Sequence, residues 1–224
     1  MKNKLLFYPC ISLLMLLIAN VSLAASANKY IGNSSRELLT ALKWDERYEQ
    51  ERKKDTDYLL GNIDGDLLKG FTPEQKEQVL LSMRNAVLNQ LLTDKDSFKN
   101  YLLDQYNQFF TIDEIGKLAA YFKTAVMQMV IQSQIDQKQL VIEQINHKLD
   151  TASGAEKEVM KQFRDSYLNT RYARFQEKIK PILNKMIFER LKEVLAVAMV
   201  KLPDLIKAMQ AHQSINLDLK IPKL

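Results

Sequence analysis

The sequence predicts an all-α protein, in which a single-domain bundle of six to eight helices follows a cleavable N-terminal signal peptide. Apolar residues recur at helical spacing along most of the chain, which is the main signal of amphipathic helices. Glycine and proline are scarce, with 6 and 5 among 224 residues. A chain of this length buries roughly 70% of the surface that its unfolded form exposes, so the bundle needs no covalent cross-links.

The first 24 residues predict where the protein works. Two lysines near the start precede an apolar run over residues 5–19, and Ser22 and Ala24 are small residues at the two positions that a signal peptidase reads. We therefore expect a signal peptide over residues 1–24, with cleavage near Ala24. The mature protein is then periplasmic or secreted.

Two other interpretations of this leader are weaker. An uncleaved membrane anchor needs about 20 consecutive apolar residues, and this run is shorter and contains Pro9. A lipoprotein needs small residues before its cysteine, whereas Phe7, Tyr8 and Pro9 precede Cys10. Cleavage removes Cys10, the only cysteine, and lowers the formal net charge from +5 to +3. Disulfides, thiol catalysis and cysteine-based zinc sites are therefore excluded from the mature protein.

The helical domain is expected over residues 34–212, after a linker over residues 25–33. Ser34, Thr72 and Thr111 are each followed three residues later by glutamate or glutamine, the pattern of a capping box at the start of a helix. Apolar residues at helical spacing follow the second and third of these starts: Leu80, Met83, Val87, Leu91, Leu102, Tyr106, Phe109, Phe110, Ile115, Leu118, Ala119 and Phe122.

The boundaries of the later helices are predicted from turn residues and prolines. The helix that starts after Thr111 is expected to run toward His147, with a bend near Thr124, and a loop near residues 151–154 follows. Pro181 and Pro203 each remove an amide donor and clash with the preceding turn, so each is expected to separate two helices. The expected helices of the second half are 155–179, 181–201 and 203–212.

Two segments do not have the pattern of an amphipathic helix. Residues 194–200 are apolar at seven consecutive positions, so this helix is expected to be buried on all sides or to face a partner, including a second copy. The tail, residues 213–224, alternates between apolar and polar residues over 215–221, which is strand periodicity. It has three possible fates: an extended docked tail, pairing with another copy, or disorder.

One segment of the chain resembles a known family. Residues 109–128 read F-F-T-I-D-E-I-G-K-L-A-A-Y-F-K-T-A-V-M-Q. They are similar to the signature F-T-x-x-E-x-x-x-L-x-x-F-Y-x-S-P-x-G-Q of an exported bacterial family, domain of unknown function 2059. Ala125 and Met127 stand where that signature has proline and glycine. The resemblance covers residues 92–148, and these residues carry it: Phe110, Thr111, Glu114, Leu118, Tyr121, Phe122, Thr124 and Gln128.

The resemblance implies an exported all-α protein. It supplies neither an activity nor catalytic residues, because the family has no assigned activity. The signature also has a purely structural interpretation, since Thr111 and Glu114 can cap a helix while Leu118 and Phe122 pack it against its neighbours.

No pattern in the sequence identifies a catalytic, cofactor-binding or metal-binding site. The two histidines, His147 and His212, are far apart in sequence and lack the spacing of a zinc site. There is no G-x-S-x-G elbow and no glycine-rich phosphate loop. We therefore expect no enzyme and no cofactor, and an envelope glycan hydrolase that uses a carboxylate pair is only the third hypothesis.

Basic residues form the one predicted surface for binding. Residues 155–192 contain 10 lysines and arginines against 5 acidic residues. On a continuous helix, five of the basic residues fall within one stripe: Lys157, Lys161, Arg164, Arg171 and Lys178. The stripe either contacts a protein partner or an anionic lipid surface, or it pairs with the acidic front half of the chain.

The function predicted from these observations is that of a non-enzymatic protein of the cell envelope. We expect a scaffold, an assembly factor or a chaperone-like module that binds protein partners through helical surfaces. Peripheral association with anionic lipid through the basic stripe is the alternative. Nucleic acid is excluded as a partner by the predicted export, the low net charge and the absence of a recognised binding motif.

Overall fold

The computed structural model of the protein describes most of the chain after residue 32. The predicted signal peptide and nearly all of the predicted linker lie outside the described residues, as do His212 and most of the predicted tail. The described residues are 33–61, 68–69, 71–211, 219 and 221–222.

The described part of the chain is an α-helical bundle, which confirms the predicted fold class. A helical segment over residues 33–41 comes first. The helices that follow are α2 (Trp44–Gly61), α3 (Pro73–Thr93), α4 (Lys95–Phe109), α5 (Ile112–Lys123), α6 (Ala125–Asp136), α7 (Ile142–Thr151), α8 (Gly154–Asp165) and α9 (Tyr167–Gln210).

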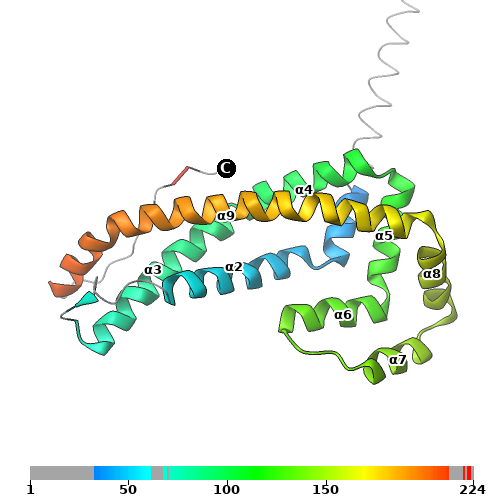
Figure 1. Ribbon diagram of the computed structural model, residues 1–224, viewed down its shortest axis with the longest axis horizontal. Helices are drawn as coiled ribbons and strands as arrows, with labels where there is room; N and C mark the ends of the chain where they lie inside the picture. The colour runs from blue at the N-terminus through cyan, green and yellow to red at the C-terminus, as the bar shows by residue number, and fades with distance from the viewer. Residues whose placement is uncertain (1–32, 62–67, 70, 212–218, 220, 223–224) are drawn as a thin grey trace, which may run out of the picture.

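The long helix α9 organises the molecule. It runs the length of the bundle and packs on α3 and α4, while α2 lies beside α3 (Figure 1). At the N-terminal end of α9, helices α5, α6, α7 and α8 follow one another in an open ring (Figure 1). Within this ring α5 packs on both α6 and α8, whereas α7 packs chiefly on α6.

Capping boxes begin α3 and α5 where the sequence predicts them. The Thr72 hydroxyl accepts a hydrogen bond from the Gln75 amide at 3.3 Å, and the Gln75 side chain accepts one from the Thr72 amide at 3.0 Å. Thr111 and Glu114 make the same reciprocal pair at the start of α5. The bend expected near Thr124 is a complete break, because Thr124 ends α5 and caps α6. A further break, over residues 138–141, separates α6 from α7.

Two apolar cores share α9. The first core contains Tyr106, Phe110, Ile115, Leu118 and Phe122, and the N-terminal half of α9 closes it with Leu168, Phe175 and Ile179. The second core lies between α2, α3 and the C-terminal half of α9. It contains Val79, Met83, Val87, Leu91, Leu191, Val194, Ala198, Leu202 and Leu205. A small cluster of Tyr48, Phe98 and Ile187 lies between them.

The predicted helix boundaries at Pro181 and Pro203 are wrong, because α9 continues through both prolines. A proline inside a helix removes one hydrogen bond and costs about 3 kcal/mol. Here the same face of the helix stays buried on both sides of each proline, from Ile179 to Ile187 and from Leu202 to Leu205. The packing of that face on two cores outweighs the local cost.

Residues 194–200 are not buried on all sides. Val194 and Ala198 are fully buried, but Val200 is 78% exposed. The segment is therefore about two amphipathic turns of α9, with their inner face in the second core. No helix among the described residues is long and apolar enough to span a membrane.

The described residues of the tail dock on the bundle. Leu219 is 3% exposed and belongs to the second core, and Ile221 packs against the same core. The carbonyl of Pro222 accepts a hydrogen bond from Arg190 Nη2 at 2.6 Å. The sequence left three alternatives for the tail, and the described residues adopt the first of them, an extended segment docked on the bundle.

A buried ion pair joins the junction of α3 and α4 to α9. Arg190 Nε and Nη2 donate to the two carboxylate oxygens of Asp94 at 2.7 and 3.2 Å, and both residues are almost inaccessible to solvent. This bidentate geometry suits the planar guanidinium. The same arginine binds Glu193 and the Pro222 carbonyl, so one side chain connects α4, α9 and the tail.

Candidate functional site

The predicted basic stripe is divided between two helices. The prediction of a continuous helix over residues 155–179 is wrong, because α8 ends at Asp165 and α9 begins at Tyr167. Between them, Ser166 is extended, with φ −93° and ψ 154°, and its amide and hydroxyl both donate to the Phe163 carbonyl. The stripe residues on α8 are Lys157, Lys161 and Arg164, and those on α9 are Arg171 and Lys178.

The three basic residues of α8 line a groove of about 540 Å³, which we call the basic-rimmed groove. They are exposed, as are Asp150 and Asn169 in the same groove. Its apolar surface comes from α5, α6, α7 and α8 and consists of Tyr121, Val126, Met127, Leu149, Met160 and Phe163.

The cations of the groove are only partly neutralised by the rest of the molecule. Arg164 forms a bidentate ion pair with the adjacent Asp165, at 2.8 and 3.2 Å. Lys157 donates to the carbonyl of Asp150 in the last turn of α7, at 2.9 Å. Lys161 has no hydrogen bond or ion pair within the described residues. The groove therefore combines an apolar surface with exposed positive charge.

The remaining stripe residues lie elsewhere. Arg171 binds Glu114 at 2.7 Å and donates to the Phe109 carbonyl, and its guanidinium lies over the rings of Phe109 and Phe110. Among the described residues, Arg171 is the one member of the stripe that pairs with an acidic residue of the front half, so the prediction of internal pairing applies to it. Lys178 is exposed on α9 and has no hydrogen bond or ion pair within the described residues.

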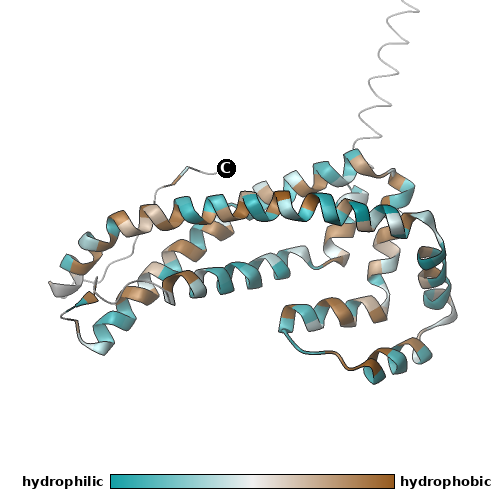
Figure 2. Ribbon diagram, in the orientation of Figure 1, coloured by the Kyte–Doolittle hydropathy of each residue, from teal (hydrophilic) through white to brown (hydrophobic). Residues whose placement is uncertain are grey.

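Helices α7 and α8 form an arm with little core of its own, which we call the α7–α8 arm (residues 142–165). Neither helix has a fully buried side chain. Val141 and Ile142, where the chain enters α7, are exposed, the latter at 71%, and Figure 2 shows this apolar stretch at the outside of the ring. Stacking of Tyr121 on Phe163, with ring centroids 3.9 Å apart, holds α8 to α5.

Glu156 joins the start of α8 to the start of α6. One carboxylate oxygen accepts from the amide and hydroxyl of Ser153 at 3.1 Å, which caps α8. The other accepts from the amide of Ala125 in the first turn of α6, at 2.8 Å. The hydrogen bonds from Ala125 and Ser153 lower the pKa of Glu156 below its ordinary value of 4.5. One ionised carboxylate thus serves two helix N-termini, where negative charge is favourable.

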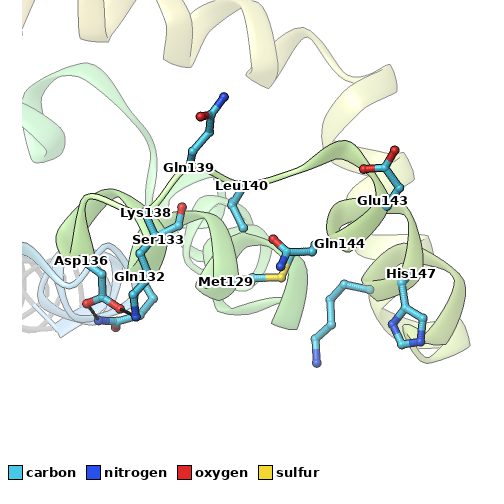
Figure 3. Close-up of a pocket in the computed structure, with 11 residues that line it drawn as sticks. Met129, Gln132, Ser133, Asp136, Lys138, Gln139, Leu140, Glu143, Gln144 and His147 are labelled. Atoms are coloured by element: carbon cyan, nitrogen blue, oxygen red, sulfur yellow. Dashed lines mark hydrogen bonds and ion pairs between the residues drawn. The ribbon is translucent and has the colours of Figure 1, made fainter.

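A second hollow, of about 870 Å³, lies between α6 and α7 (Figure 3). Met129, Leu140 and Gln144 lie near its centre, while Asp136 and His147 lie at opposite sides (Figure 3). These two titratable groups therefore do not converge on one point, as general acid and base catalysis would require. Among the described residues, no group of three or more histidine, cysteine and acidic side chains is arranged to hold a metal ion.

The residues that carry the family resemblance have structural roles. Phe110, Leu118 and Phe122 are in the first core. The Gln128 amide group donates to the carbonyls of Ala41 and Phe122, both at 2.6 Å, so it satisfies a free carbonyl in the last turn of α5. Glu114 both caps α5 and binds Arg171.

Comparison with known proteins does not identify the chain. No protein-family model matches it, and neither a curated protein nor a solved structure matches it. The resemblance to domain of unknown function 2059 is therefore a proposal, supported by the residues quoted above.

Sequence reasoning found the cations of the groove but not its apolar half. Met127, Leu149 and Met160 lie on three different helices, so no single helical face predicts that they meet. The break between α8 and α9 did have a signal, because Ser166 is of the type that starts helices. Ser153 with Glu156 is likewise a capping box that the sequence contains.

Proposed function

We propose that the protein is a non-enzymatic binding module of the bacterial cell envelope, which holds an acidic, amphipathic segment of a partner protein in the basic-rimmed groove. The observation that carries the proposal is the meeting of exposed cations and apolar side chains from four helices in one groove. An acidic amphipathic segment complements both features, since its apolar face covers the groove and its carboxylates meet Lys157, Lys161 and Arg164.

The architecture of the arm also supports binding to a protein segment. Helices α7 and α8 are amphipathic, and none of their apolar side chains is fully buried within this chain. Exposed Val141 and Ile142 extend the available apolar surface beyond the groove. A partner segment that packs against the arm supplies the apolar contacts that the arm lacks, as in other helix-in-groove complexes.

Residues 1–24 are the basis for the proposed cellular location of the protein. A basic start, an apolar run and a small-residue cleavage site support export and cleavage near Ala24. The resemblance to an exported bacterial family supports the same cellular location. Sequencing the N-terminus of the protein purified from its native cells should give Ala25 as the first residue, and a mature chain that retains Met1 would contradict export by this route.

Photo-crosslinking in intact cells tests the proposed groove. A photoreactive phenylalanine analogue at Asn169, in the groove, should give a discrete adduct whose partner segment, mapped by mass spectrometry, is acidic and amphipathic. The same analogue at Glu177, exposed on α9 and not among the residues that line the groove, is the matched control. A partner segment without acidic residues would contradict the proposal, as would an equal adduct at both positions.

Charge variants then test what holds the segment. K161Q/R164Q removes two cations of the groove and should reduce the adduct at Asn169 by about tenfold, because about two charge-assisted contacts are lost. K178Q/K185Q removes two exposed cations of α9 and should leave it unchanged. Equal effects of the two pairs would show that net charge, rather than the groove, attracts the partner.

Anionic lipid is the second candidate, because the same cations and apolar side chains suit a lipid headgroup and its chain. It predicts that the protein sediments with vesicles of phosphatidylglycerol and phosphatidylcholine, but not with phosphatidylcholine alone. Sedimentation should be lost at high salt and in K161Q/R164Q. Arg171 is left intact in this test because it holds α9 to α5.

A further inference from the structure

A buried arginine lies in the wall of a hollow between α2 and α9. The hollow has a volume of about 450 Å³, and its lining shares no residue with the basic-rimmed groove. Arg52, on α2, is only 5% exposed although it carries a full charge. Charged side chains are almost never buried to this degree unless they are paired, so the partners of Arg52 decide what the hollow can hold.

Most of the hydrogen-bonding capacity of Arg52 is unused. Its Nη2 lies 2.8 Å from Asp55 Oδ2 and 3.7 Å from Glu51 Oε2. Its Nε and Nη1 carry three of the five N–H donors of the guanidinium, and both are buried without an acceptor among the residues that the structure describes. One face of the group lies over the Tyr48 ring, with Cζ 5.0 Å from the ring centroid. Buried donors without acceptors destabilise a folded protein. Binding of an acceptor from outside the chain would satisfy these donors and is therefore favourable here.

The charges around the hollow favour an anion. Lys54 and Lys180 line it from α2 and α9, and neither has an ion pair or hydrogen bond within the described residues. The two acids of the hollow, Glu51 and Asp55, are both directed at Arg52. The uncharged amide of Asn184 adds one more donor.

The other side of the hollow is apolar. Ile187, Phe188 and Leu191 line it from α9, and Phe188 is half exposed although it is a large aromatic side chain. The site therefore offers donors and positive charge at one side and a short apolar surface at the other.

We propose that this hollow binds a small carboxylate with a short apolar chain. The carboxylate replaces that of Asp55 on the Nη1 and Nη2 edge of Arg52, because a carboxylate matches this edge with two parallel hydrogen bonds. Asp55, whose side chain is 41% exposed, then turns to solvent. Lys180 and Asn184 bind the outer side of the ligand carboxylate, and its chain lies on Ile187, Phe188 and Leu191. This site does not depend on the function proposed for the groove.

Calorimetric titration of the full mature protein with octanoate, acetate and 1-octanol tests the site. Octanoate should bind more tightly than either acetate, which lacks the chain, or 1-octanol, which lacks the charge. R52M should raise the Kd of octanoate at least about tenfold, the loss expected for hydrogen bonds to a charged group. R84M, which removes an arginine from the surface of α3, should leave it unchanged.

A stability measurement separates a binding role of Arg52 from a structural one. Without ligand, R52M should unfold at the same or a higher temperature than the wild type, because it removes a buried charge with unsatisfied donors. A large fall in melting temperature would assign Arg52 to the fold and overturn the proposal. K180A/N184A, at exposed positions, gives an independent test and should raise the Kd about threefold or more. Equal binding of octanoate and 1-octanol, or no binding of octanoate, would also overturn it.

Discussion

Single carboxylates have different tasks in this protein according to their surroundings. Asp94 is buried against Arg190, whereas Glu156 is only partly buried and accepts hydrogen bonds from two helix N-termini. Asp57 pairs with Arg84 on the surface. Because burial sets the strength of such interactions, removal of each carboxylate has a different expected cost.

Asp94→Asn should lower the free energy of unfolding by about 3–5 kcal/mol, because it removes the buried carboxylate that balances the charge of Arg190 and leaves the half-exposed Glu193 as its acidic partner. Asp57→Asn, at the exposed pair, is the matched control and should cost at most about 1 kcal/mol. Urea denaturation of both variants measures the difference. Equal losses would mean that the burial of Asp94 does not strengthen its pair.

Glu156→Gln should destabilise the protein near neutral pH and have less effect in acid. The pKa of Glu156 is lowered in the folded state, so its contribution to stability is fully present above the unfolded value of 4.5. That contribution is lost as the pH falls through the lower folded pKa. Urea unfolding at pH 6.5, 4.5 and 3 should therefore show a difference from wild type that shrinks with the pH. A constant difference would assign the effect to side-chain shape alone.

At the scale of elements, the arm differs from the rest of the bundle. Helix α7 has no buried side chain and packs chiefly on α6, whereas α5 buries Ile115, Leu118, Ala119 and Phe122. Local opening is easiest where few apolar contacts are lost. The arm is therefore the element best able to adjust to a partner.

Hydrogen exchange followed by mass spectrometry measures this difference. The amides of α7 should exchange at least about tenfold faster than those of α5, after correction for intrinsic rates. Peptides of α5 provide the internal control within the same sample. Equal protection of the two helices would contradict the weak attachment of α7.

The elements also show which sequence signals decide the structure. The capping boxes at Thr72 and Thr111 predict the starts of α3 and α5 because a cap is a local interaction. The helix boundaries predicted at Pro181 and Pro203 are wrong, because tertiary packing along α9 outweighs the local cost of each proline. The buried state of Arg52 could not be predicted, since it depends on how α2 lies against α9.

At the scale of the whole molecule, α9 makes the two cores parts of one structure. Phe175 belongs to the first core and Leu205 to the second, and both lie on this helix. Loss of packing in either core should therefore weaken the other. Trp44, the only tryptophan, packs against the first core and against the small cluster of Tyr48, Phe98 and Ile187, so its fluorescence reports on that part of the molecule.

Leu205→Ala should cost about 2–5 kcal/mol and shift the unfolding midpoints of Trp44 fluorescence and of helical circular dichroism equally. Phe175→Ala, in the first core, should also shift both probes together. A Leu205→Ala variant that moves the circular dichroism midpoint and leaves the Trp44 midpoint in place would show that the cores unfold independently.

The docked tail has a consequence for the time at which the protein can fold. Leu219 completes a core that also contains Leu60, so this core cannot be complete until residue 219 has left the ribosome. Contacts between residues so distant in sequence also form late, because the intervening chain must first be brought together. A nascent chain with this order of contacts therefore has an incomplete second core until residue 219 has been synthesised and can pack in the same core as Leu60.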